Sequence, residues 1–84
     1  MVKEEIWSIP VQRVCAFFRR QEDVTEAASS VFRFHSCQIT LSELEPNKIG
    51  PWEISRTRIH IEGEEADAKS IYNRFSNQFL SAGG

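Results

Sequence analysis

The residues of this sequence best suited to chemistry lie in the segment SRTRIHIEG, residues 55–63. Successive side chains of a β-strand point to opposite faces. The alternation therefore predicts a strand with one apolar face and one basic face, made respectively of Thr57, Ile59 and Ile61 and of Arg56, Arg58 and His60. The guanidinium groups on the basic face can pair with carboxylates of a protein partner or with phosphates of a nucleic acid.

Nucleic-acid binding is the alternative interpretation of this basic row. Arg13, Phe17 and Arg19 would join the row if residues 11–19 formed a neighbouring strand. An aromatic ring among arginines on an open sheet can stack bases, as RNA-recognition modules do. The sequence holds no RNP-type string, and two acids on the same strand partly neutralise the row. We therefore expect a protein partner, with single-stranded nucleic acid as the second hypothesis.

The cysteines and histidines form no metal-binding or catalytic motif. Cys15, His35, Cys37 and His60 have the ligand count of a structural zinc site but lack its short paired spacing. Both cysteines are instead expected to be buried thiols. His35, Ser36 and Cys37 are adjacent, but no known nucleophile or phosphate-loop motif surrounds them. We expect no metal, no cofactor, no small-molecule substrate and no enzymatic activity.

Two further features have a functional and a structural interpretation. Gly83-Gly84 matches the conjugation handle of ubiquitin-like and sulfur-carrier proteins, where the pair follows a final strand as a free tail. Here the pair follows a helical pattern, so Gly83 is expected to cap a helix. The acids that follow Gly63 are expected to form the first turn of that helix rather than a cation site.

Trp7 and Trp52 lie beside prolines, outside the main apolar rows. Tryptophans in irregular segments of a small domain serve either as anchors at an interface or as lids over the core. The sequence leaves both roles open. We include both tryptophans in the predicted binding surface, at the border of the basic row.

Hydrophobic periodicity predicts five elements that would position these residues. Residues 64–80 carry apolar side chains at spacings of three and four, which indicates an amphipathic helix. Residues 36–45 and 52–63 alternate and predict a hairpin with a loose connection. Residues 21–34 are read as a first helix. Residues 11–19 fit a strand or a helix, and their β-branched and aromatic content favours the strand.

In this order the elements predict an α+β domain, with a small antiparallel sheet and two helices packed on one face. The arrangement is a ferredoxin-like split βαββα pattern, whose other sheet face would be open and would present the basic row. The alternative is a winged helix-turn-helix, with a helix at residues 9–20 and a recognition helix at ITLSELE. Glu43 and Glu45 would then meet DNA phosphates, which argues against it.

Length and composition further narrow the classes of function that this chain can have. The 84 residues are expected to form a single domain, 1–84, with a small core that a second subunit would help to complete. A net charge of −2 argues against general attraction to polyphosphates. No apolar run is long enough for a membrane span, and no secretory signal or disulfide framework is evident, so a cytoplasmic location is expected. Together these features predict a small interaction or regulatory domain, most simply a homodimer.

Overall fold

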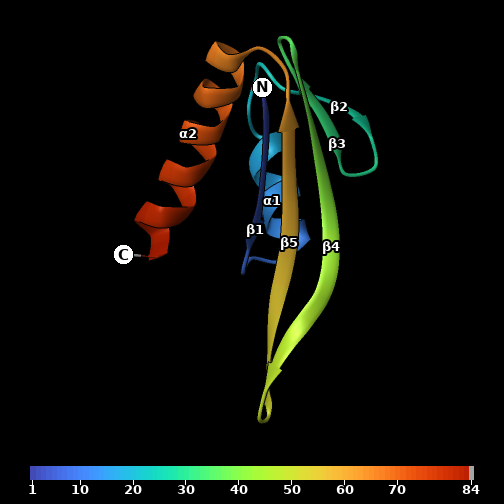
Figure 1. The fold of residues 1–84 in the computed structure, drawn as a ribbon, viewed down its shortest axis with the longest axis vertical. Coiled ribbons are helices and arrows are strands. Elements are labelled where there is room, and N and C mark those ends of the chain that lie inside the picture. Colours follow the sequence, from blue (N-terminus) through green and yellow to red (C-terminus); the bar gives the residue numbers. More distant parts are fainter. Residues whose placement is uncertain (84) are drawn as a thin grey trace.

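The computed structural model describes the backbone of residues 1–83 and the side chains of residues 1–80. The elements are β1 (Val2–Trp7), α1 (Val11–Arg19), β2 (Thr25–Ala28), β3 (Val31–Phe34), β4 (Cys37–Ile49), β5 (Trp52–Glu62) and α2 (Glu65–Gly83). The strands form one antiparallel sheet in the order β1-β5-β4-β3-β2, with both helices behind the same face (Figure 1). The α+β class, the antiparallel sheet and the two helices are therefore confirmed.

The core lies between this sheet face and the two helices. Thr57, Ile59 and Ile61 are buried, as are Ile39 and Leu41 on the neighbouring strand β4. Phenylalanine rings fill the space between the elements, and the centre of the cluster is formed by Phe17, Phe18, Phe32 and Phe75. Burial of each such ring contributes about 1.5–3 kcal/mol to stability, so these rings supply much of the driving force of folding.

The expected strand at residues 11–19 is wrong, because this segment is the helix α1. Its buried residues are Val14, Cys15, Phe17 and Phe18, which lie together on one helical stripe. The amide of Arg13 donates to the Pro10 carbonyl at 3.0 Å and starts the helix. The helix buries two rings against α2 and β3, and this tertiary packing outweighs the β propensity of the segment.

The expected helix at residues 21–34 is also wrong, because the segment forms the hairpin of β2 and β3. Phe32 and Phe34 are buried while Arg33 between them is exposed, which is the period of a strand. Ser30 takes a φ of 61° at the turn, where a helix would end. Pairing of β3 with β4 places Phe32 opposite Ile39, and the local sequence does not predict this pairing.

These two corrections remove the basis of the ferredoxin-like split βαββα pattern. That pattern needed a strand at 11–19 and a helix at 21–34, and the structure has the opposite in both places. The winged helix-turn-helix alternative expected the helix at 9–20 correctly. Its recognition helix is wrong, because ITLSELE lies within β4.

A short network joins the start of α2 to the hairpin turn between β3 and β4. The Ser36 hydroxyl donates to the Asp67 carboxylate at 2.7 Å and accepts from the Glu64 amide at 3.0 Å. Glu65 and Asp67 are the acids of the first turn, as the sequence predicts. Gly63 lies against Cys37, and a Cβ at this glycine would lie 2.6 Å from the Cys37 sulfur. The helix therefore begins at a fixed point on the sheet.

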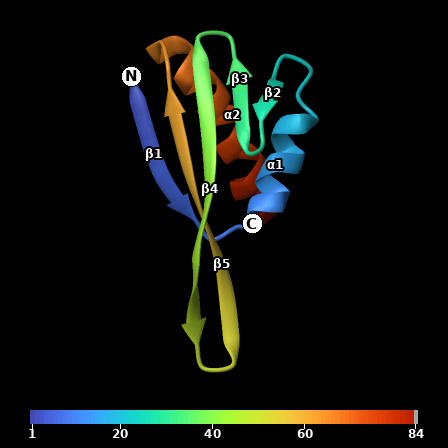
Figure 2. The ribbon, with the colours of Figure 1, turned by 90° about the vertical axis from the view of Figure 1, so that its right-hand side faces the viewer.

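Beyond the sheet, β4 and β5 continue as a two-stranded arm of residues 43–56. The pairing of β1 ends where Trp7 meets Thr57, and the pairing of β3 ends where Val31 meets Thr40. The arm therefore has no neighbouring strand within the described chain (Figure 2). It twists strongly, and its strands cross in this view, as isolated two-stranded ribbons do. An irregularity between Leu44 and Asn47 marks its bend.

Candidate protein-binding surface

The basic row lies on the open face of the sheet, opposite the helices. Arg58 is exposed and His60 is partly exposed, while Thr57, Ile59 and Ile61 between them are buried. Across the sheet His60 lies between Thr40 of β4 and Glu4 of β1. Arg58 lies in the same way between Ser42 and Ile6. The predicted alternation of β5 is therefore confirmed.

Strand β1 adds a carboxylate that the sequence did not place beside the row. The Glu4 carboxylate lies 3.3 Å from His60 Nδ1 and 3.9 Å from Arg58 Nε. Glu62 lies 3.7 Å from the other ring nitrogen of His60. These groups are partly exposed, so each pair contributes no more than about 1 kcal/mol. Their main effect is to make this part of the face mixed in charge.

Arg56 differs from the other arginine of the row. Its Nη1 group donates to the backbone carbonyl of Glu45 at 3.5 Å. Among the described side chains no carboxylate lies within ion-pair distance of Arg56. This guanidinium is held at the base of the arm and keeps capacity for an external acid.

Arg13 and Phe17 do not belong to this face, because α1 places them on the other side of the sheet. Phe17 is only 3% exposed and packs edge-on against Phe18, Phe75 and Phe79. The Arg13 guanidinium lies over the Phe79 ring at 5.7 Å. Arg19 pairs with Glu26 at 3.0 Å. The basic row therefore lacks the base-stacking aromatic that the sequence-based hypothesis assigned to it.

Trp7 is a lid over the core and not an exposed anchor. Its ring meets Phe75 edge-on with centroids 4.9 Å apart. The indole Nε1 donates to the Glu5 carboxylate at 2.9 Å, and the Tyr72 hydroxyl donates to the same oxygen at 2.7 Å. The hydrogen bond from Tyr72 is the main reason that the pKa of Glu5 is lowered. The polar hydrogens of Trp7 and Tyr72 therefore both find an acceptor within the chain.

Trp52 has the opposite environment, at the tip of the arm. Its side chain is 72% exposed, and Ile49, directly opposite on β4, is 60% exposed. Ile54 follows two residues along β5, so the three side chains share one face of the ribbon. The loose connection expected at residues 46–51 is instead the end of this arm, because β4 runs to Ile49 and β5 begins at Trp52. The signal for the arm in the sequence is the pair of alternating runs on either side of a segment that is too short for any other element.

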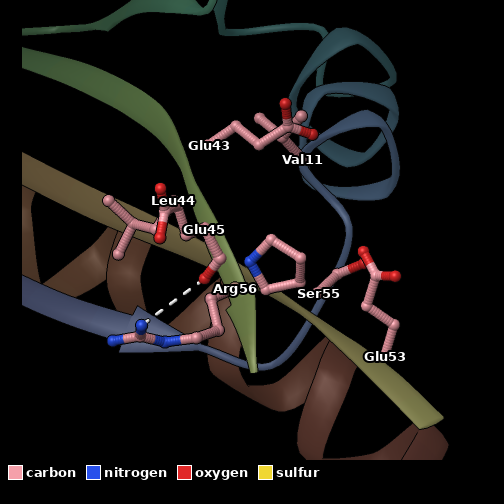
Figure 3. A pocket seen from close by; sticks show the side chains of 8 residues that line it. Val11, Glu43, Leu44, Glu45, Glu53, Ser55 and Arg56 are labelled. Atoms are coloured by element: carbon pink, nitrogen blue, oxygen red, sulfur yellow. Dashed lines mark hydrogen bonds between the residues drawn. The ribbon is translucent and has the colours of Figure 1, made fainter. Parts of the chain in front are cut away.

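A pocket lies at the base of the arm, beside the first turn of α1 (Figure 3). The close view shows Glu43 directed toward Val11, and the Arg56 side chain turned away toward the Glu45 carbonyl. The lining combines three apolar side chains with three carboxylates, one hydroxyl and one guanidinium. The lining residues are Val11, Glu43, Leu44, Glu45, Pro46, Glu53, Ser55 and Arg56. The pocket therefore suits a group that is apolar in its body and positively charged at its edge.

One comparison with known proteins identifies the family. The family described as "Archaeal MoaD-like protein" matches residues 2–84, nearly the whole chain. The chain belongs to the archaeal MoaD-like family. No curated protein matches it.

In this MoaD-like chain, Gly83 is the last residue of α2. The helix runs to Gly83, and Gly84 lies outside the described residues, so the expected cap at Gly83 stays a prediction. In the described part of the chain no helix is both long and apolar enough to cross a membrane.

The remaining candidate groups of the MoaD-like chain lie apart from the arm. Cys15 and Cys37 are both buried free thiols, and burial raises the pKa of Cys37. His35 takes a φ of 53° at the turn between β3 and β4, and its ring packs on Phe34. His60 and Cys37 project from opposite faces of the sheet. Within residues 1–80 no three metal-binding side chains gather in one place.

Proposed function

We propose that this MoaD-like protein is a non-enzymatic, cytoplasmic protein-interaction domain that binds through its arm and the adjoining open sheet face. One observation carries the proposal, namely the exposure of Trp52, Ile49 and Ile54 on one face of the arm. Large apolar side chains gathered on an exposed element mark interaction sites, and tryptophan is the residue most enriched among energetically dominant contacts. The cost of exposing these groups is relieved when a partner covers them.

The sheet face next to the arm extends this surface. Seven large apolar side chains are exposed in residues 1–80, and five of them lie on the same side of their strands as the basic row. These five are Val2, Ile6, Ile49, Trp52 and Ile54. Arg56 lies between the arm and the sheet, and no carboxylate among the side chains of residues 1–80 pairs with it. In a complex the apolar residues would supply affinity, and Arg56 would pair with an acid of the partner and fix its orientation.

Single-stranded nucleic-acid binding through the basic row stays a second hypothesis with less support. Arg58 and His60 already face Glu4, and phosphates would have to displace or tolerate that carboxylate. Phe17, the ring expected to stack on bases, is in the core. Binding of this kind would weaken steeply as the salt concentration rises.

Sulfur carriage is a candidate from a different class, and membership of the MoaD-like family favours it. MoaD-like proteins often act as sulfur carriers, and carriers of this kind use a terminal Gly-Gly, the dipeptide found here at Gly83-Gly84. A helix that continues to Gly83 would have to unwind in its last turn to free such a tail. Protein isolated from its natural cells would then show the mass increase of one oxygen replaced by sulfur at Gly84. A plain carboxylate there, or a natural chain extending beyond Gly84, would reject this candidate.

The interaction proposal is tested by capture of partners on immobilised protein. Wild type is compared with Trp52→Ser and with Leu80→Ser, which removes an equally exposed apolar side chain from α2. The proposal expects a partner, or the chain itself, to be retained by wild type and by Leu80→Ser and lost with Trp52→Ser. A wild-type chain that is monomeric at high concentration, and retains nothing that depends on Trp52, would overturn it.

A further inference from the structure

We propose that the partner of the arm is a second copy of this chain. The arms of two copies lie antiparallel about a two-fold axis, and each arm tip enters the pocket at the base of the other arm. This inference rests on the proposed function, because it names the partner for the same exposed residues. It also assigns an occupant to the pocket.

The tip and the pocket are complementary in charge. Three carboxylates, those of Glu43, Glu45 and Glu53, and one guanidinium, that of Arg56, line the pocket, so its lining is acidic on balance. The tip carries Lys48, which is exposed and forms no ion pair with any described side chain, although Glu53 lies opposite it in the hairpin. Lys48 lies on the face of the ribbon opposite Ile49 and Trp52, so its ammonium group and the indole would meet different walls of the pocket. Delivered by another copy, this ammonium group would lie among the carboxylates of the rim. The excess of carboxylates over guanidinium in the lining favours an occupant that brings a cation, and the tip of a second copy brings Lys48.

The tip and the pocket also match in their apolar parts. Val11, Leu44 and Pro46 supply the apolar lining of the pocket (Figure 3). Trp52 and Ile49 supply an exposed indole and an exposed aliphatic chain at the tip. The pocket is an open hollow of about 510 Å³, which is ample for one indole.

The positions of tip and pocket on the arm allow both insertions at once. Leu44 in the pocket and Ile49 at the tip belong to the same strand and are separated along it by about 15 Å. A two-fold axis across the middle of the arm superposes the tip of each copy on the pocket of the other. The contact is therefore isologous and closes at two copies, with no free site left to extend a fibre.

The area of this contact is in the range that a specific dimer needs. A covered tryptophan buries roughly 150–250 Å². Two indoles, the isoleucines beside them and the pocket walls that they cover together approach about 1,000 Å², the lower bound for a specific interface. The affinity is therefore expected to be modest and to depend strongly on Trp52.

Sedimentation equilibrium of the full chain over a wide concentration range tests the proposal. Wild type is expected to pass from monomer to dimer, and Trp52→Ser is expected to weaken the dimer by at least about tenfold. The Leu80→Ser control is expected to dimerise as wild type does. Circular dichroism checks that each variant stays folded, which exposure of the substituted residues favours.

Charge reversal identifies the pocket as the receiving site. Lys48→Glu alone and Glu45→Lys alone are each expected to weaken the dimer, whereas the double variant is expected to recover much of the wild-type affinity. A dimer that is insensitive to Trp52→Ser or Lys48→Glu would overturn the proposal, as would failure of the double variant to recover.

Failure of this inference can be told apart from failure of the proposed function. If wild type is monomeric but still captures another protein in a Trp52-dependent way, the second copy is rejected and the interaction function stands. If wild type is monomeric and no capture depends on Trp52, both are rejected.

Discussion

The Tyr72 hydroxyl donates a 2.7 Å hydrogen bond to the Glu5 carboxylate and so ties the last helix to the first strand across 67 positions of the chain. Lys3 lies over the Tyr72 ring at 4.2 Å and 3.5 Å from the same carboxylate. Strand β1 is an edge strand that pairs only with β5 in the described chain. The tyrosine therefore holds in place the strand that brings Glu4 to the basic row.

Tyr72→Phe is expected to destabilise the protein by about 1–2 kcal/mol, because the carboxylate of Glu5 loses a donor while the ring is kept. Urea unfolding measures the change. Glu5→Gln keeps an acceptor for Trp7 and Tyr72 and is the matched control, with a smaller loss. Equal stability of Tyr72→Phe and wild type would show that water replaces the hydroxyl without cost.

The same pair predicts how stability varies with pH. Burial first, and then Glu5, raise the pKa of Tyr72 to about 12 from 10.0. Because the pKa of Tyr72 is raised in the folded state, its protonated hydroxyl contributes fully to stability below pH 10. This contribution is lost as the pH rises toward 12. Unfolding in urea at several alkaline pH values should show this loss in wild type and not in Tyr72→Phe. A parallel decline in both proteins would assign it to other groups.

Gly63→Ala is expected to destabilise the protein by about 1–3 kcal/mol, because the added carbon would overlap the Cys37 sulfur and the Ser36 carbonyl. Gly50→Ala is the matched control. No atom lies within 4 Å of its added carbon, so the cost there is only that of a φ of 59°, about 1 kcal/mol. Thermal unfolding ranks the two variants. A larger loss for Gly50→Ala would contradict the close contact at Gly63.

Both thiols are expected to react slowly with an alkylating reagent in the folded protein. Cys37 is fully buried, and desolvation disfavours its thiolate and raises its pKa. Cys15 is also buried in the core. Reaction should accelerate greatly in denaturant. Rapid labelling of Cys37 in the folded protein would instead indicate a reactive thiol close to His35 in the sequence.

Phe17→Ala is expected to destabilise the protein by about 3–5 kcal/mol, because it empties a space between three other rings. Loss of nucleic-acid binding in this variant would therefore report unfolding. Arg58→Glu, on the exposed face, is the informative variant. Fluorescence anisotropy with labelled single-stranded RNA and DNA at low and moderate salt is expected to show no tight binding. Binding that falls with salt and with Arg58→Glu would support the second hypothesis.

The sequence determined the parts of this protein whose pattern is local and repeated. The alternation in β5 and the three-and-four spacing in α2 each extend over ten or more residues, and each admits one regular structure with one buried side. The buried rows and the acids at the start of α2 followed from those patterns. Burial of both cysteines followed from their apolar setting.

Only the tertiary structure decided the short or ambiguous segments. In residues 11–19 the strand and helix patterns both fit, and the contact of Phe17 and Phe18 with Phe75 selected the helix. In residues 21–34 the pairing of β3 with β4 outweighed a helical stripe. The elements that form there, α1, β2 and β3, have nine residues or fewer, which is too few repeats to fix a period, so long-range burial decides the structure.

The surface likewise has features that the sequence determined and features that only the tertiary structure decided. Sequence alternation placed Arg56, Arg58 and His60 on one side of a strand, since that side depends only on the pleat. It could not place Glu4 against His60, 56 positions away, nor bury Trp7 while leaving Trp52 at the end of an arm. Those outcomes depend on which strands end where in the sheet, and strand pairing is a property of the whole fold.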